Sequence, residues 1–527
     1  MLAMCVALAL AFFVVPALTD SGQKASAEWP YTLIYYDGHI HTTRSDGNGS
    51  VADIKATALA RGLDVVIITD HCKEMTLAEW QSLVAETAAA FGGGFLALPG
   101  FEITGREGIF NRGHMNAYNA PDPFVGDDAL ELCPEEVWPD ADPGGNPDGT
   151  GPMYPENLAK WADYVHSQGG IANHNHTSGS TQLSYGVDNI EVYNQGHVDD
   201  VASYARLLGF PAQLAWQFGI TLNNFAIYGE RDVNMPVPFP GIDDDFDGIP
   251  DEDPTDGVDN DTDTKVDEDG PVSPLRLVLY VATKMLTGVG QWLGSPQAPL
   301  NSWDQLLMAY VDGTVDKPTF AVANSDAHNT GEADSNVGVA KNGLYVLALT
   351  PRQVYSAIKA GRSFATTGPS LEFDVNGMLM GGTSYIAAGG SANLNLSANS
   401  EIPTAVLVKI DVIKNGEVVQ TISPMSPTYA ATLTYPMTER GYYRVEVTAL
   451  DLATNAYQFA YSNPVFVKCP FDKDCDGYLD LIEKLLGSNP DDAASTPENI
   501  LIRGTCRDGL DNDKDGLVDS ADRGCRW

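Results

Sequence analysis

Histidine and acidic residues stand directly after short apolar segments at several places in this sequence. The first of these places is His39-Ile40-His41, which follows the apolar run 33–36. On a strand, residues two positions apart project to the same side, so both imidazoles could reach one metal ion. A single His-x-His pair is weak evidence for such a site. Its weight depends on whether the same arrangement recurs along the chain.

The arrangement recurs at further apolar segments. The residues that follow or open these segments are Asp70, His71, Glu102, His114, His174, His176, Asp326 and His328. Imidazole and carboxylate groups suit zinc, manganese or iron(II), and no cysteine is needed. Each pair taken singly fits an ordinary surface turn, but all of them together do not. The sequence therefore predicts a metal site.

Short strands alternate with amphipathic helices between residues 31 and 368. The pattern predicts strands at 65–68, 95–98, 114–118, 170–172, 189–193 and 319–324, and helices at 51–61, 76–91, 155–168 and 199–208. Repeated strand–helix units predict a mostly parallel sheet or barrel, whose strands end on one face and would bring the predicted ligands into one pocket. A loop at 120–152 and an acidic run at 240–271 interrupt the pattern, and 272–310 reads as helical again.

The pattern changes to a period of two between residues 369 and 468. Alternating segments at 392–396, 406–413 and 442–447 are separated by turns such as Asn415-Gly416. This alternation predicts an antiparallel β-sandwich of the immunoglobulin-like kind. The region contains no histidine, so we expect the chemistry to lie in the preceding residues.

The chain is strongly acidic. Of its 527 residues, 71 are acidic and 30 are basic, giving a net charge of −41, and 43% are hydrophobic. This length and composition predict a globular protein of roughly two to four domains. The charge argues against nucleic acid and anionic membranes as partners. Much of the acidity lies in 243–269, 472–492 and 508–522, which suggests that hard cations bind there.

The N-terminal segment resembles an export signal. Residues 2–18 are almost wholly apolar, and Ala25-Ser26-Ala27 fits a small-residue cleavage site. We expect residues 1–27 to be a signal peptide and the protein to be secreted or to lie in the periplasm or cell envelope. The alternative is a membrane anchor, for which the run is short. No other long apolar stretch exists, so we expect no membrane span after cleavage.

The last segment, residues 469–527, is too short to build a core and needs bridges or ions. Four cysteines gather there, which suits disulfides in an exported protein. We expect Cys469 to pair with Cys475 and Cys506 with Cys525, although the sequence leaves other connectivities open. No partner is evident for Cys72 or Cys133.

Acidic residues in this segment and in 240–271 have the spacing of a calcium loop, with oxygen ligands at positions 1, 3, 5, 9 and 12 and glycine at 6. The candidate calcium ligands are Asp472, Asp474, Asp476, Asp480 and Glu483; Asp511, Asp513, Asp515, Asp519 and Asp522; Asp243, Asp245, Asp247 and Asp251; and Asp259, Asp261, Asp263 and Asp267. These repeats resemble thrombospondin type 3-like calcium repeats. The alternative is a solvated acidic linker.

The histidine motifs resemble those of the PHP metallohydrolases, the polymerase and histidinol phosphatase family. The matching residues are His39-Ile40-His41, Asp46, Thr69-Asp70-His71, Pro99-Gly100-Phe101-Glu102, His114, His174 and Ser325-Asp326-Ala327-His328. The run from Gly361-Arg362-Ser363-Phe364 to Thr367-Gly368-Pro369, before a β-sandwich, resembles the secreted CehA/McbA-like branch. The resemblance implies an α/β fold with a distorted (β/α)7 barrel over 31–368, a sandwich over 369–468 and a calcium-binding segment over 469–527.

The resemblance also implies two to three divalent transition ions (Zn, Mn or Fe). One ion would take His39, His41, Glu102 and Asp326; a second would share Glu102 and add His114 and His174; a third would take Asp46, His71 and His328. His176 competes with His174 for one role, and we expect His174 to fill it because it adjoins the strand. We expect Asp70 to orient a ligand.

The expected activity is hydrolysis of a small-molecule phosphoester or carboxyl or carbamate ester, with a metal-activated water as the nucleophile and Glu102 bridging two ions. His176 or Arg44 could assist the leaving group or hold an anion. The alternative is a non-catalytic exported protein that uses calcium for adhesion or binding. The sequence leaves the substrate and the oligomeric state open.

Overall fold

The computed structural model describes residues 30–104, 114–120, 155–175, 186–194, 303–330, 335–454, 456–499, 501–502 and 504–526. The predicted signal peptide, the predicted helix at 199–208, the acidic insertion 240–271 and His176 lie outside these residues, as does nearly all of the loop 120–152. Within the described residues, no helix combines the length and the apolar character needed to cross a bilayer. The described residues from Tyr31 onward belong to one compact unit.

The first strands neighbour one another across a sheet in chain order. They are β1 (Thr32–Asp37), β2 (Val65–Ile68), β3 (Leu96–Thr104), β4 (His114–Tyr118), β5 (Ile171–Asn175), β6 (Asn189–Asn194) and β7 (Phe320–Asn324). Strands β1 to β3 are parallel, as are β5 to β7, whereas β4 is antiparallel to both neighbours. Beyond β7, Ala327 forms a parallel bridge with Ile40. The chain after β7 therefore lies against the chain after β1.

Strand β3 runs on to Thr104, beyond the end predicted at Leu98. Its first residues pair with β2, and from Gly100 onward it pairs with β4. A Cβ atom on Gly100 would lie 2.9 Å from the Ala117 carbonyl oxygen, so this exchange of partners needs a residue without a side chain. At Pro99-Gly100, β3 thus changes its pairing partner from β2 to β4. Glu102 lies on the part of β3 that pairs with β4.

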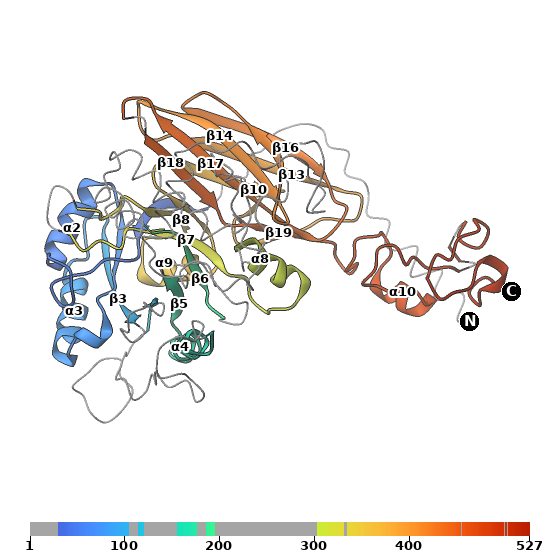
Figure 1. Cartoon of the computed structure of the whole chain (residues 1–527), viewed down its shortest axis with the longest axis horizontal. Coiled ribbons are helices and arrows are strands. Elements are labelled where there is room, and N and C mark those ends of the chain that lie inside the picture. Colours follow the sequence, from blue (N-terminus) through green and yellow to red (C-terminus); the bar gives the residue numbers. More distant parts are fainter. Residues whose placement is uncertain are drawn as a thin grey trace, which may run out of the picture. The chain divides into compact units, whose positions relative to one another are not determined.

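Helices cover the sheet where the sequence predicts them. They include α2 (Val51–Ala60), α3 (Leu77–Ala89) and α4 (Pro155–Ser167), and Figure 1 shows α2 and α3 together beside β3. Ser50 caps α2 and Thr76 caps α3, each in a reciprocal capping box with the acidic residue three positions later. The structure adds α9 (Pro351–Lys359), which the sequence analysis did not predict.

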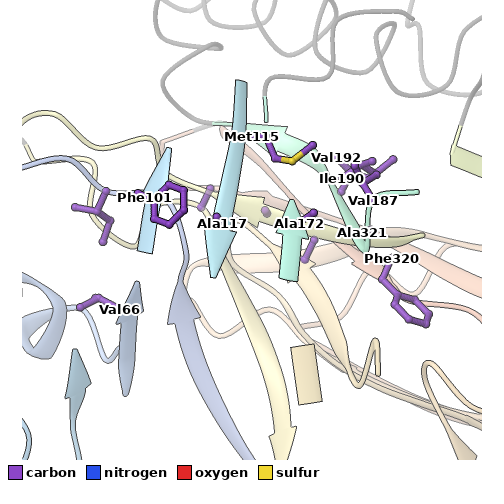
Figure 2. Close-up of a cluster of buried hydrophobic side chains, with 14 of the residues drawn as sticks. Val66, Phe101, Met115, Ala117, Ala172, Val187, Ile190, Val192, Phe320 and Ala321 are labelled. Atoms are coloured by element: carbon purple, nitrogen blue, oxygen red, sulfur yellow. The ribbon is translucent and has the colours of Figure 1, made fainter. Parts of the chain in front are cut away.

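Both faces of the sheet are buried. In β2, Val65 and Ile67 join one apolar cluster, whereas Val66 and Ile68 join a second one. Figure 2 shows the second cluster, in which Val66 lies with residues from β3 to β7. A sheet covered on both faces gives continuous apolar strands, which is the pattern of Val65–Ile68. The polar side chains of the predicted site accordingly lie at the ends of the strands.

The residues after β7 extend this sheet and add a second one. Strands β8 (Lys341–Val346) and β9 (Ser363–Thr366) continue it beyond β1. It is extended further by β12 (Thr383–Tyr385), β14 (Ala405–Lys414), β15 (Glu417–Ile422), β17 (Gly441–Asp451), β18 (Ala456–Ser462) and β19 (Val465–Lys468). The second sheet contains β10 (Ser370–Val375), β11 (Met378–Leu379), β13 (Ser391–Asn399) and β16 (Thr428–Pro436).

The antiparallel strands predicted between 369 and 468 are thus present. The predicted turn has φ values of 52° at Asn415 and 93° at Gly416, as a tight hairpin requires. The structure differs from a separate sandwich in one respect, because β18 pairs with β9 and hydrogen bonds run across the expected boundary at 368. A period of two identifies a strand but not its partner, so the sequence could not show this continuity.

A buried ion cluster joins helix α8 (Trp303–Asp312) to β17. The Arg444 guanidinium is fully buried and forms two hydrogen bonds to the Asp304 carboxylate, of 2.8 and 2.7 Å. It also pairs with Glu446 and lies 4.7 Å from the centre of the Trp303 ring. The Trp303 indole nitrogen donates to the Thr319 carbonyl, next to β7. The cluster therefore anchors the start of the strand that leads to Asp326.

Replacing Arg444 with methionine should cost about 3–5 kcal/mol of unfolding free energy, because Asp304 and Glu446 would remain buried without their cation. Chemical denaturation measures this loss. Lys414→Met is the control, since its partner Glu439 is exposed and such a pair contributes about 1 kcal/mol or less. Equal losses in the two variants would contradict the anchoring role.

Candidate metal centre

The turn after β1 is shaped by a buried carboxylate. Asp37 accepts hydrogen bonds from the backbone nitrogens of His39 (3.4 Å), Ser325 (3.1 Å) and Gly338 (2.8 Å). Burial raises the pKa of Asp37 to about 6, although these hydrogen bonds lower it. The contact with Ser325 ties the turn after β1 to the turn after β7. His39 and Asp326 are thereby held close together.

His39, His41 and Asp326 form the first group of potential ligands. Asp326 Oδ1 lies 3.1 Å from His39 Nε2 and 3.3 Å from His41 Nε2. The two imidazole nitrogens lie 3.4 and 3.5 Å from the oxygens of Glu102. Asp326 has a φ of 52°, a strained backbone conformation that aspartate tolerates better than most residues. Such strain is often found where a functional side chain must be aimed.

Glu102, His71 and His114 form the second group. Glu102 is fully buried, and its Oε1 lies 2.8 Å from His114 Nδ1 while its Oε2 lies 2.9 Å from His71 Nδ1. Because Glu102 also faces His39 and His41, its two oxygens join the first group to the second. This is the position that the sequence analysis expected for a bridging carboxylate.

Asp46, His41, His71 and His328 form the third group. Asp46 Oδ2 lies 3.1 Å from His328 Nε2 and 3.5 Å from His71 Nε2, and its Oδ1 lies 3.3 Å from His41 Nδ1. The side chains of Asp46 and His328 are 46% and 41% exposed, whereas those of His39, His41 and Glu102 are 0% exposed. The site therefore has a closed side and an open side.

The three groups share residues in a way that the sequence analysis did not anticipate. His41 faces the first group with Nε2 and Asp46 with Nδ1. His71 faces Glu102 with Nδ1 and Asp46 with Nε2. The sequence analysis expected each of these two imidazoles to bind a single ion. Their two nitrogens instead connect the open side of the site to the buried carboxylate.

The charges in the site balance one another. Burial raises the pKa of Glu102, but His114, His39 and His71 bring it well below its usual value. Burial lowers the pKa of His71, but Glu102 and Asp46 raise it to about 10. Without a metal, protons on imidazoles therefore compensate the carboxylates. Divalent cations compete for the same nitrogen atoms, as metal sites in general require.

The described donors fit transition metals. Imidazole nitrogens and carboxylate oxygens are the ligands that zinc, manganese and iron(II) accept together. The buried atoms His41 Nε2 and Glu102 Oε2 make no hydrogen bond of good geometry among the described residues, although Asp326 Oδ1 lies 3.3 Å from the first and His71 Nδ1 lies 2.9 Å from the second. Buried polar atoms without hydrogen bonds are costly, and a bound cation would satisfy both. The site is thus suited to hold metal.

Asp70 holds the loop between His41 and Asp46. Its carboxylate accepts hydrogen bonds from the Thr42 backbone nitrogen (2.6 Å), the Thr42 hydroxyl (2.7 Å) and the Ser45 hydroxyl (2.8 Å). These contacts correspond to the orienting role expected for this residue. Arg44, in the same loop, pairs with Glu86 on α3 at 2.5 Å.

His174 lies on β5 and is buried. Its cross-strand neighbour is Met115, whereas Asn175 lies opposite His114. Adjacent residues of a strand project to opposite faces, so Asn175 rather than His174 shares the face of His114. Asn175 Nδ2 donates to Glu102 Oε1 at 2.8 Å. A ligand role for His174 stays a prediction.

Sequence analysis missed Glu191, which contacts the predicted ligand His39. Glu191 Oε1 lies 2.9 Å from His39 Nδ1, and Asn324 Nδ2 donates to the same oxygen at 2.8 Å. Glu191 stands between the apolar residues Ile190 and Val192 of β6. A carboxylate at such a position requires a buried partner, and this pattern could have identified it.

In the first predicted calcium loop, three of the predicted ligands gather, whereas Asp480 accepts a hydrogen bond from the Lys473 backbone nitrogen at 2.7 Å. Asp472, Asp474 and Asp476 gather their carboxylates, and Gly477 has a φ of 101°, which favours glycine there. Glu483, on α10 (Asp480–Leu486), is fully buried. Burial, together with Asp474 and Asp476, raises its pKa to about 7. One oxygen of each of these four carboxylates is buried without a hydrogen-bond partner in the described residues.

The second loop differs from its prediction. Asp511 and Asp513 gather with Glu498, a buried residue that the spacing rule did not include. The predicted ligand Asp519 instead accepts a hydrogen bond from the Gly509 backbone nitrogen at 3.2 Å. The rule counts positions within one loop, so it cannot find a carboxylate supplied from outside the loop.

The disulfides Cys469–Cys475 and Cys506–Cys525 are confirmed. Cys72, for which the sequence showed no partner, is also disulfide-bonded.

No protein-family model matches this chain, and no curated protein matches it. A two-domain protein from Bacteroides vulgatus, described as containing a predicted PHP-like metal-dependent phosphoesterase, aligns over 83% of this chain and 95% of its own, with 11% identity and a TM-score of 0.34. An amidohydrolase from Chromobacterium violaceum, with bound sulfate and no metal, aligns over 32% and 81%, with 17% identity and a TM-score of 0.22. Because both TM-scores are below 0.5, the case for the site rests on the distances given above.

Adding zinc or manganese should stabilise the folded protein by about 2.7 kcal/mol when the free ion is at 100 times its dissociation constant. His41→Ala should lose most of this gain, because His41 contributes to two of the ligand groups. His166→Ala is the matched control. His166 does not belong to any of the three ligand groups, and its Nε2 lies 2.7 Å from Asp188 Oδ2. Thermal unfolding with and without metal provides the measurement. An unchanged metal response in His41→Ala would contradict the assignment.

Proposed function

We propose that this chain is a metal-dependent hydrolase that cleaves a phosphoester or a carboxyl or carbamate ester. The observation that carries the proposal is the position of Glu102, a fully buried carboxylate whose two oxygens face imidazoles from three other segments. Such a carboxylate can bridge cations. Water-activating sites of hydrolases often use metals held in this way.

Transition ions would be held by His39, His41, Asp326, Glu102, His71, His114, Asp46 and His328. When bound, such ions supply Lewis acidity that favours hydroxide over water and neutralises negative charge on the reacting group. The chain itself supplies a closed wall at His39 and Glu102, which excludes bulk water from one side. Asp46 and His328 line the open side, from which a small substrate would approach.

The finer assignments are also proposals. The chain would be a PHP-type metallohydrolase of the CehA/McbA-like branch, with strands β1 to β7 as a distorted (β/α)7 barrel and the remaining sheets as an immunoglobulin-like sandwich. The bridge between Ile40 and Ala327 supports the barrel, because it joins the chain just after β1 to the chain just after β7. Export is supported by the disulfides, which persist in oxidising compartments.

A side-by-side assay of a nitrophenyl phosphate, a nitrophenyl acetate and a naphthyl carbamate tests the activity. We expect turnover of at least one substrate, a loss of about 100-fold or more after chelation, and recovery with zinc, manganese or iron(II); this loss corresponds to about 2.7 kcal/mol of activation free energy. Glu102→Gln should behave like the chelated enzyme, whereas His166→Ala should retain activity. Absence of turnover by the metal-loaded chain would favour the non-catalytic binding protein instead.

We also propose that the C-terminal segment binds calcium as a structural ion. The four buried carboxylate oxygens of Asp472, Asp474, Asp476 and Glu483 support this, because like charges so close together require a cation. The calcium would hold together a segment with little apolar core.

Isothermal titration with calcium tests this second proposal. Glu483→Gln should weaken binding at one site about tenfold or more, because calcium affinity follows the number of charged ligands. Glu417→Gln, at an exposed position of β15, should bind as the wild type does. Equal calcium binding by the wild type and Glu483→Gln would contradict the site.

A further inference from the structure

Glu191 is a buried carboxylate between two apolar residues of β6. Its neighbours Ile190 and Val192 belong to the apolar cluster shown in Figure 2. Successive residues of a strand project to opposite faces, so Glu191, between Ile190 and Val192, projects away from that cluster. Its Oε1 lies 2.9 Å from His39 Nδ1 and accepts a hydrogen bond from Asn324 Nδ2 at 2.8 Å. The side chain thus joins β6 to the turn after β1.

The contact decides which nitrogen of His39 faces the candidate metal site. An ionised carboxylate only accepts hydrogen bonds, so His39 Nδ1 must carry the proton. His39 Nε2 then points to the other side, where it lies 3.1 Å from Asp326 Oδ1 and 3.4 Å from Glu102 Oε1. A neutral imidazole in this tautomer has its lone pair on Nε2, which is the form that binds a metal ion.

Glu191 is itself held in place by neighbouring strands. Asn324, which donates to it, accepts a hydrogen bond from the Gly38 backbone nitrogen at 3.0 Å. The side chain of Asn342, on β8, accepts a hydrogen bond from the Ala323 backbone nitrogen (2.8 Å) and donates one to the Ala323 carbonyl oxygen (2.6 Å). The carboxylate and the histidine turn are therefore fixed by the same buried network.

We infer that Glu191 is the positioning residue for His39: it fixes the tautomer and the orientation of the imidazole toward a divalent cation. This inference rests on the proposed function. Carboxylates that accept from the second nitrogen of a metal-binding histidine affect metal affinity by about 10- to 100-fold. A purely structural Glu191 would instead affect stability and leave metal affinity unchanged.

Two substitutions of similar volume separate these roles. Glu191→Met removes the hydrogen-bond acceptor, and Glu191→Gln keeps an amide oxygen that can accept from His39 Nδ1. We expect zinc affinity, measured by titration calorimetry, to fall about 10- to 100-fold in Glu191→Met and to recover to within about threefold of the wild type in Glu191→Gln. The visible spectrum of bound cobalt(II) should change in the first variant and not in the second.

Asp188→Ala is the matched control. Asp188 is also buried, accepts from the Ala172 backbone nitrogen and pairs with His166, but it does not contact the candidate ligands within the described residues. This variant should lose stability while keeping zinc affinity within about twofold of the wild type. A drop comparable with that of Glu191→Met would show that any lost buried carboxylate weakens binding, and would overturn the inference.

The His39→Ala background tests whether Glu191 acts through His39. In that background, Glu191→Met should weaken zinc binding by no more than about twofold, since the oriented group is gone. If Glu191→Met weakened zinc binding in the His39→Ala background as much as in the wild type, the inference would be overturned and the proposed function would stand. Equal zinc affinities of the wild type and Glu191→Met would have the same consequence. A wild-type chain that binds no zinc, manganese or cobalt would overturn the proposed function as well.

Discussion

The structure around the candidate site depends on the burial of one carboxylate, that of Glu102. Removing a charge from water is costly unless opposite charges and hydrogen bonds compensate for it. Glu102 is compensated by imidazoles that arrive from the ends of other strands and by the amide of Asn175. The strands must therefore end at one place, and the apolar faces of the sheet must hold them there. A site of this kind has the ligand types and the burial that suit a bound cation.

Hydrogen bonds behind the candidate ligands give the site its shape. Asp37 and Asn324 hold the turn that carries His39, and Asp70 holds the loop that carries Asp46. Most of these groups are buried, so each lost hydrogen bond would leave an unsatisfied polar atom. These hydrogen bonds hold the buried side of the site, whereas the side chains of Asp46 and His328 are partly exposed.

The sequence predicted the parts of the fold that follow from local pattern. The capped helices after Ser50 and Thr76, the apolar strand Val65–Ile68 and the histidines at the strand ends all stand where their spacing places them. The sequence did not reveal how His41 and His71 face two groups at once, because this depends on ring orientation. Nor did it reveal Glu191 or Glu498, since each acts on residues far from it along the chain. The pairing of β9 with β18 was hidden for the same reason.

We propose that these buried groups hold metal. Anomalous X-ray diffraction from crystals grown with zinc or manganese, recorded on both sides of the absorption edge, tests it most directly. We expect anomalous peaks bounded by His39, His41, Glu102 and Asp326, with zinc about 2.0–2.1 Å from the imidazole nitrogens. Crystals that show these side chains in place and no anomalous peak among them would contradict it.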